Sequence, residues 1–170
     1  NAANERCLGG GGIDGRIGKL GGDALYEARR ALPLIPGTSA RCLTGDAKTT
    51  IAGDLPCDFV IHAVGPNFNH YDSQNEAMIL LKDAYKNAML RASEHKLKKV
   101  AFSMLSAGVF RGKCSLNEVI SVGLDSIAQG VYPELERVYF CAFTESEQQT
   151  VRELAVAHSI DVLDEARVPK

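Results

Sequence analysis

The chain has 170 residues, about the size of one domain, and a protein of this length is expected to bury ~68–70% of its surface on folding. We therefore expect a single domain over residues 1–170. Apolar residues make up 45% and charged residues 24% of the chain, a composition that disfavours disorder, collagen and coiled coils. The formal net charge of −2 excludes the broad basic surface that non-specific binding to nucleic acid requires.

Signals for targeting and for metal binding are weak. No stretch approaches ~18 consecutive apolar residues, and the first residues lack the basic-then-apolar order of a signal peptide. Five cysteines form no CxxC pair and are odd in number, which disfavours a disulfide scaffold or a structural zinc site. We expect an intracellular monomer, in the cytoplasm or nucleus, that needs no membrane, metal or cofactor.

In chain order, the first predicted element is a helix. A glycine-rich segment, 9–22, precedes residues 23–32, which suit a helix that ends before Pro33. Residues 59–64 form a short apolar, β-branched run and are predicted to be a buried strand. Ser73 and the glutamate three residues later resemble a capping box, so we expect a helix from there to about residue 94.

The second half of the chain continues the alternation of strands and helices. Residues 99–105 and 137–141 are predicted strands, and the serine and threonine that open segments 115–118 and 144–147 are predicted to cap two further helices. This order predicts an α/β fold with a largely parallel or mixed sheet covered on both faces. The carboxyl ends of the strands are the expected ligand-binding edge.

Four consecutive glycines at 9–12 form the first loop with possible chemistry. Glycine runs are costly in backbone entropy, so they indicate either positive φ angles or a ligand lying against bare backbone. Bare amides followed by a helix start attract phosphate, whereas the alternative is a flexible loop with no ligand. The absence of GxxxxGK[ST] disfavours a nucleotide triphosphatase.

A second loop, 106–112, directly follows the strand predicted at 99–105. Its small residues and Gly108 would let backbone N–H groups approach an anion, Phe110 offers an apolar wall and Arg111 adds a charge. The alternative is a tight turn between a strand and a helix.

Asp14 and Asn4 are the candidate polar residues of the first loop. A carboxylate close to a helix start can hold a water against a reacting carbon, although an aspartate there is also a favoured N-cap. Asn4 has the same alternative, because it could simply cap its own turn. His62 lies inside an apolar strand and is predicted to be a core histidine rather than a base.

Four separated motifs together resemble the macrodomain family, especially its MacroD-type ADP-ribosyl hydrolases. They are the run from Asn-Ala-Ala-Asn to Gly-Gly-Gly-Gly-Ile-Asp-Gly over residues 1–15, and the segments 44–48, 60–66 and 106–110. The resemblance runs from residue 1 to about residue 147. It implies a three-layer α/β/α sandwich that binds ADP-ribose, or an ADP-ribosylated protein, across the strand ends.

The resemblance also implies roles for individual residues. Asn4 would hold the distal ribose, Asp14 would orient or activate the attacking water, and Phe143 would lie against adenine. The diphosphate and distal ribose would be wrapped by two loops, namely Gly9, Gly10, Gly11, Gly12 and Ile13 in the first and Ser106, Ala107, Gly108, Val109 and Phe110 in the second. We expect hydrolysis of mono-ADP-ribosyl esters on acidic side chains or of O-acyl-ADP-ribose. A non-catalytic reader of ADP-ribosylated proteins and an ADP-ribose 1″-phosphate phosphatase are the alternatives.

The sequence departs from the family pattern at three places. Gly18 stands where MacroD-type members commonly have histidine, and Phe110 stands where they often have tyrosine. Family members also carry strands before the Asn-Ala-Ala-Asn motif, with an acidic residue for the adenine amino group. We therefore expect the sheet to lack its first strands, with an open position beside the strands at 59–64 and 99–105. We expect the natural polypeptide to continue upstream of Asn1 with a β-branched apolar strand, and the alternative is a chain whose missing strand comes from elsewhere.

Overall fold

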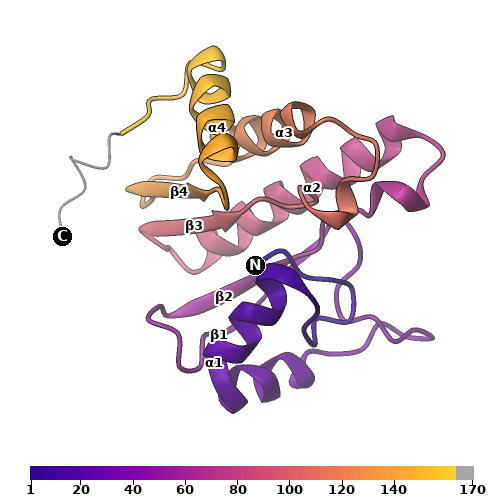
Figure 1. The fold of residues 1–170 in the computed structure, drawn as a ribbon. Coiled ribbons are helices and arrows are strands. Elements are labelled where there is room, and N and C mark those ends of the chain that lie inside the picture. The colour runs from indigo at the N-terminus through magenta and orange to yellow at the C-terminus, as the bar shows by residue number, and fades with distance from the viewer. Residues whose placement is uncertain (164–170) are drawn as a thin grey trace.

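The computed structural model describes residues 1–163, in which helices and strands alternate along most of the chain (Figure 1). In chain order the elements are α1 (Gly12–Ala31), β1 (Ala47–Ile51), β2 (Phe59–Ala63), the 3₁₀ turn η1 (Phe68–His70), α2 (Gln74–Glu94), β3 (Lys99–Ser103), the 3₁₀ turn η2 (Val109–Arg111), α3 (Leu116–Gln129), β4 (Arg137–Cys141) and α4 (Glu145–Ala157). The prediction of one domain over residues 1–170 remains a prediction, and its last seven residues lie outside the described part.

Both strand orientations occur in the described residues. β1 pairs antiparallel with β2, and β3 pairs parallel with β4. Successive side chains of a strand face opposite sides of the sheet. In β2, Val60 packs with Leu25 of α1, whereas Ile61 and Ala63 pack with the core beneath α2. Helices therefore cover both faces of the strands, which are antiparallel in one pair and parallel in the other, and this confirms the α/β/α sandwich predicted from the sequence.

The main hydrophobic core lies under α2 and joins the two strand pairs. Tyr85 and Ala88 of α2 belong to the same buried cluster as Ala63 of β2 and Phe102 of β3. The hydroxyl of Tyr85 accepts a hydrogen bond of 2.9 Å from the backbone N–H of Leu105, just beyond β3. α3 packs on α2 and α4 packs on α3, so the three helices follow one another in space, with α2 passing behind β3 in the view of Figure 1.

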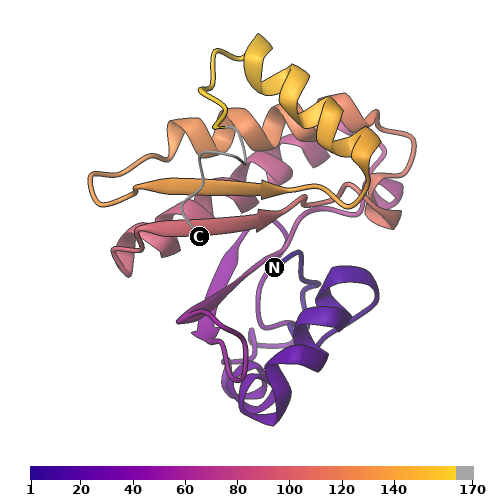
Figure 2. The same ribbon diagram turned by 60° about the vertical axis from the view of Figure 1, so that its left-hand side comes forward.

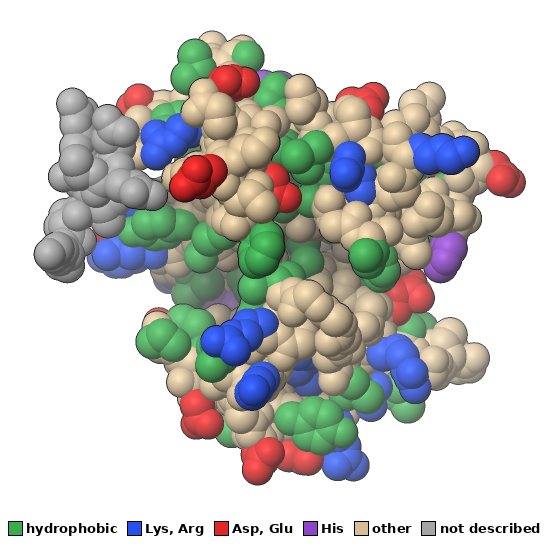
Figure 3. Space-filling view, viewed as in Figure 1, with side chains coloured by type: hydrophobic (Ala, Val, Ile, Leu, Met, Phe, Trp, Pro, Cys, Tyr) green, Lys and Arg blue, Asp and Glu red, His purple; other side chains and the backbone are tan. Residues whose placement is uncertain are grey.

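The position between β2 and β3 is open, as predicted. Among residues 1–163 these two strands do not pair with each other, and a groove of about 380 Å³ lies between them, lined mainly by apolar side chains from both. The segment 1–3 crosses the end of this groove: the N–H of Ala3 donates to the carbonyl of Ala63, and the N–H of Ala2 donates to Oγ of Ser103. Figure 3 shows hydrophobic side chains along the boundary between the upper part of the molecule, which contains β3 and β4, and the lower part, which contains α1. The expectation about the natural polypeptide upstream of Asn1 remains a prediction.

The first helix and the first strand differ from the prediction. The helix predicted from residue 23 is present after a break at Gly22 (φ 66°, ψ −165°), but a helical segment that was not predicted precedes the break, so α1 as a whole begins at Gly12. Glycine disfavours helices intrinsically, but here tertiary packing overrides that preference. β1 was not predicted, although its Lys-Thr-Thr-Ile run is rich in β-branched residues, which favour strands.

The predicted helix caps are largely confirmed. α3 and α4 each begin with a complete capping box, formed by Ser115 with Glu118 and by Thr144 with Glu147. At α2, Oγ of Ser73 accepts a hydrogen bond from the N–H of the glutamate three residues later. These contacts are local, which explains why the sequence pattern predicts them.

Candidate functional site

The two predicted loops lie at one edge of the molecule, the carboxyl edge of β2, β3 and β4. In Figure 2, β3 and β4 point toward the side of the molecule that carries the start of α1. Oγ of Ser106 donates a hydrogen bond of 2.7 Å to the carbonyl of Pro66, beyond the end of β2. The topology therefore brings the segments that follow three strands to a common edge, where ligands bind in open α/β sheets.

The glycine loop presents open backbone. A Cβ added at Gly9, Gly11 or Gly12 would meet no atom within 4 Å, and Gly9 and Gly12 have positive φ angles of 105° and 58°. Gly10 faces inward, because a Cβ there would lie 3.1 Å from Nδ2 of Asn4 and 3.3 Å from Oδ2 of Asp14. The loop thus leaves backbone open at three of its glycines, and Gly10 contacts the two candidate polar side chains.

Among residues 1–163, no side chain caps the start of α1. Its N-cap residue is Gly11, so the alternative that Asp14 is the N-cap is wrong. The first amides of a helix have no intrahelical partner and carry a partial positive charge, which makes this start a favourable place for an anion. Asp14 instead lies within the first turn, where a negative charge is stabilised by the helix dipole.

Asn4 shapes the loop in which it lies. Its Nδ2 donates to the carbonyl of Gly9 at 3.0 Å, and its Oδ1 accepts from the N–H of Arg6 at 3.1 Å. These bonds are those of a residue that caps its own turn, and they also hold the amide beside Gly10. Its predicted contact with a ribose remains a prediction.

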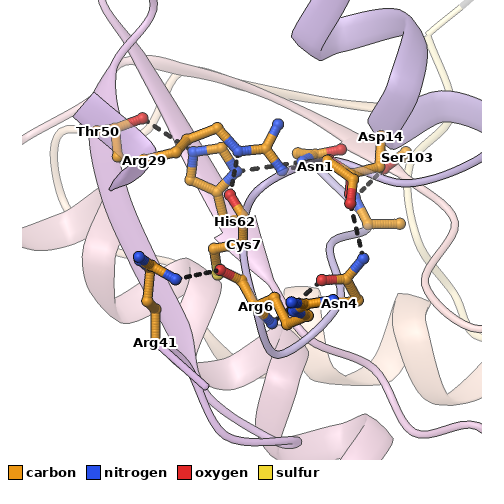
Figure 4. Close-up of polar contacts among 12 residues, drawn as sticks. Asn1, Asn4, Arg6, Cys7, Asp14, Arg29, Arg41, Thr50, His62 and Ser103 are labelled. Atoms are coloured by element: carbon orange, nitrogen blue, oxygen red, sulfur yellow. Dashed lines mark hydrogen bonds and ion pairs between the residues drawn. The ribbon is translucent and has the colours of Figure 1, made fainter. Parts of the chain in front are cut away.

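Asp14 is buried and paired with a cation (Figure 4). Its side chain is 5% exposed, and Oδ1 accepts hydrogen bonds from Nη2 of Arg29 at 2.6 Å and from Nδ2 of Asn1 at 2.8 Å. Oδ2 is also buried, but it accepts no hydrogen bond from the described residues. One carboxylate oxygen is therefore anchored, and the other, beside Gly10, keeps its capacity to accept a proton donor.

His62 extends this polar cluster into the core. One ring nitrogen lies 3.1 Å from Nδ2 of Asn1 and the other 2.9 Å from Oγ1 of Thr50, and the side chain is fully buried (Figure 4). Burial, with smaller contributions from the charges of Arg29 and the amino terminus, lowers the pKa of His62 to about 2. His62 is therefore a neutral core histidine, which agrees with the prediction and argues against a role as a general base at neutral pH.

The second loop is held by polar contacts at both ends. Ser106 has a positive φ of 54° and is fixed by its bond to Pro66, while Nδ2 of Asn69 donates to the carbonyl of Val109. A Cβ at Gly108 would meet no atom within 4 Å. The side chain of Val109 is 89% exposed, so this loop also offers an open surface that includes apolar area.

Phe143 lies just beyond β4 and is 95% exposed. Its backbone N–H donates to the carboxylate of Glu147 at 2.9 Å, which ties this residue to the capping box of α4. An exposed aromatic ring on a fixed backbone is suited to stacking against a flat ring. Its predicted place against adenine remains a prediction.

A cavity of about 290 Å³ lies between the glycine loop and α1. Its wall contains bare backbone from Gly9, Gly10, Gly15 and Gly18, and Arg29 also lines it. Within residues 1–163, no group of three or more His, Cys, Asp or Glu side chains is arranged to hold a metal ion. In the same part of the chain, none of the helices has the length and apolar character needed to cross a membrane.

Two residues of the site, Arg29 and Asn1, were not predicted from the sequence. Arg29 follows Leu25 by four residues, so both lie on one face of the helix, and both are fully buried. An arginine on an apolar helix face is a signal that a buried partner is needed. Asn1 carries no comparable local signal.

Comparisons with known proteins agree with this geometry. A family model described as the Macro domain matches residues 1–122. A macro domain-containing protein of Cupriavidus necator is 39% identical over 90% of this chain and 86% of its own length. An O-acetyl-ADP-ribose deacetylase of Klebsiella pneumoniae (strain 342) is 38% identical over 93% of this chain and 87% of its own length.

Solved structures show the same fold. A macrodomain of Oceanobacillus iheyensis with ADP has a TM-score of 0.82 at 29% identity, covering 94% of this chain and 82% of that one. A Trypanosoma brucei macrodomain in complex with ADP-ribose has a TM-score of 0.73 at 28% identity, covering 90% of this chain and 60% of that one. Together with the match over residues 1–122, these likenesses show that the chain belongs to the macro domain family.

Proposed function

We propose that this macro domain binds ADP-ribose and hydrolyses esters of it, either O-acyl-ADP-ribose or mono-ADP-ribosyl esters on acidic side chains. The diphosphate would lie against the amides of residues 9–12 and of the loop 106–110. The uncapped start of α1 supports this placement, because its amides and dipole favour a negative charge. The deacetylase name of the Klebsiella relative supports the choice of an ester substrate.

The observation that carries the proposal is the free oxygen of Asp14. Oδ1 is fixed by two donors, while Oδ2 is buried beside Gly10 without a partner among the described residues. An oriented carboxylate oxygen can accept a proton from a water and aim that water at an ester carbon. The water oxygen bonds to the acyl carbon, the ester C–O bond breaks, and the proton passes to the leaving ribose oxygen, so the products are ADP-ribose and the free acid.

Binding and turnover are tested separately. Titration calorimetry with ADP-ribose measures affinity, and chromatography of O-acetyl-ADP-ribose incubations measures release of ADP-ribose and acetate. Asp14→Asn keeps the size of the side chain, and we expect it to bind ADP-ribose within about tenfold of wild type while losing turnover, because a water-positioning group acts on the transition state. In ¹⁸O-labelled water, label in the acetate indicates that the water attacks the acyl carbon of the ester.

Three results would favour other functions. Binding without turnover by the wild type favours a non-catalytic reader. Release of phosphate from ADP-ribose 1″-phosphate without ester hydrolysis favours a phosphatase. Turnover by Asp14→Asn equal to that of wild type rejects Asp14 as the catalytic residue.

A further inference from the structure

Arg29 reaches the first turn of its own helix, although it lies fifteen residues beyond Asp14. On a straight helix this separation corresponds to ~22 Å along the axis, which is far more than an arginine side chain can span. The break at Gly22 removes this obstacle, because α1 changes direction there (Figure 1). The contact between Arg29 and Asp14 therefore depends on a specific distortion of the backbone.

The guanidinium joins the carboxylate to the loop. Nη2 donates to Oδ1 of Asp14, and Nε donates to the carbonyl of Cys7, which lies in the segment between Asn4 and the glycine run. Cys7 has a positive φ of 56°, an uncommon conformation for a residue other than glycine. One buried cation thus fixes both the carboxylate and the backbone that leads into the glycine loop.

This arrangement determines which carboxylate oxygen is free. Oδ1 receives its hydrogen bonds from Arg29 and Asn1, so the carboxyl plane is held and Oδ2 stays beside Gly10. The guanidinium is planar and presents its donors in a rigid fork, which a lysine ammonium does not reproduce. Loss of the fork would leave the carboxylate held at Oδ1 by Asn1 alone.

Stability alone is a weak explanation for such a pair. Removing two charges from water is costly, and well-packed apolar residues of similar volume are often as stabilising as a buried ion pair or more so. Arg29 and Asp14 have side-chain exposures of only 1% and 5%, so the full cost of desolvation applies. The geometry at Oδ2 offers a functional reason for the pair.

We infer that Arg29 is a positioning residue for Asp14, holding Oδ2 in the orientation that aims a water at the ester. The inference rests on the proposed ester hydrolysis. Arg29 itself would not touch the reacting atoms; it would act through Oδ1 and through the Cys7 carbonyl.

Steady-state kinetics with O-acetyl-ADP-ribose on Arg29→Lys and Arg29→Met test this inference. We expect Arg29→Met to lower kcat at least 100-fold with KM changed less than about threefold, and ADP-ribose affinity by calorimetry to stay within tenfold of wild type. Arg29→Lys keeps the charge without the fork, and we expect an intermediate kcat. Arg30→Met is the matched control, because the Arg30 side chain is exposed and forms a surface ion pair with Glu27.

Each result has a distinct meaning. A kcat of Arg29→Met within threefold of wild type overturns this inference but not the proposed function. A parallel loss of kcat and ADP-ribose affinity also overturns the inference, because it indicates a collapsed site. If Arg29→Met does not fold, Arg29→Lys decides: wild-type kcat overturns the inference, and a reduced kcat with unchanged KM supports it. No turnover by the wild type overturns the proposed function and this inference together.

Discussion

The α-carbon of Gly15 lies directly against the backbone carbonyl of Gly10. A Cβ at position 15 would clash with that carbonyl oxygen, so the helix and the loop approach each other more closely than any residue with a side chain allows. Gly18, one turn further along α1, has more room: a Cβ there would lie 3.5 Å from Nη1 of Arg29, which is an ordinary contact. The two glycines therefore have different roles although both lie within one helix.

Gly15→Ala is expected to destabilise the protein by ~1–3 kcal/mol, because the added methyl group forces the loop away from the helix. Gly18→Ala is expected to be neutral or to stabilise by up to ~1 kcal/mol, because alanine favours the helix. Urea denaturation of both variants measures the difference. Equal effects of the two substitutions would show that the close approach at Gly15 is unimportant.

The ion pair between Asp14 and Arg29 gives a second prediction. Arg29→Met leaves a buried carboxylate without its partner, and we expect a loss of ~3–5 kcal/mol in the free energy of unfolding. In the double variant with Asp14→Asn a neutral amide replaces the carboxylate, so part of that loss should be recovered. Denaturation of the two single variants and the double variant gives the coupling energy, and strictly additive effects would contradict a direct interaction.

Phe143 is expected to contribute to ligand affinity and not to folding. If its exposed ring stacks on adenine, Phe143→Ala should weaken ADP-ribose binding at least ~5-fold, as expected for the loss of ~1 kcal/mol or more of stacking. The thermal midpoint should stay unchanged, because the side chain is 95% exposed. Val131→Ala is the control, since Val131 is also exposed but precedes β4 and so lies at the opposite sheet edge. Calorimetric affinities that are equal for both variants would remove Phe143 from the site.

His62 makes stability depend on pH. Its pKa is lowered to about 2 in the folded protein, while the unfolded chain has the ordinary value of 6.5, so between these values the unfolded state binds more protons. The free energy of unfolding therefore does not depend on the protonation of His62 well above pH 6.5. Below that pH the free energy of unfolding decreases, by up to ~1.4 kcal/mol per pH unit. Urea denaturation at pH 6.5 and pH 5 should show a larger loss for wild type than for His62→Gln. The same loss in both proteins would indicate that His62 takes up a proton while folded.

The open position between β2 and β3 is expected to accept a strand. Burial lowers the pKa of the Asn1 ammonium to about 6, and the facing edges of β2 and β3 are not paired with each other. Fusing five β-branched apolar residues before Asn1 would replace the ammonium with an amide and supply ladder partners. We expect a gain of ~2 kcal/mol or more, or about 4–8 °C in Tm. A glycine-serine fusion of equal length is the control, and equal Tm values for the two fusions would contradict the prediction.

Local features of the fold could be read from the sequence because neighbouring residues determine them. The capping boxes at Ser115 and Thr144 are contacts between residues three apart, and the strand containing His62 is recognisable from its apolar run. The four motifs that resemble the macrodomain family are also recognisable from short stretches of neighbouring residues. The order of strands and helices then placed the loops at one sheet edge, because carboxyl ends of strands are the usual ligand edge.

The environment of Asp14 required the tertiary structure. The sequence determined that a carboxylate follows the glycine run, but whether it is a cap or part of a site depended on where α1 begins. Its partner Arg29 is brought near only by the break at Gly22, and Asn1 only by the approach of the first residues to β2. Long-range contacts of this kind leave no periodic pattern, because they follow from packing rather than from the preferences of adjacent residues.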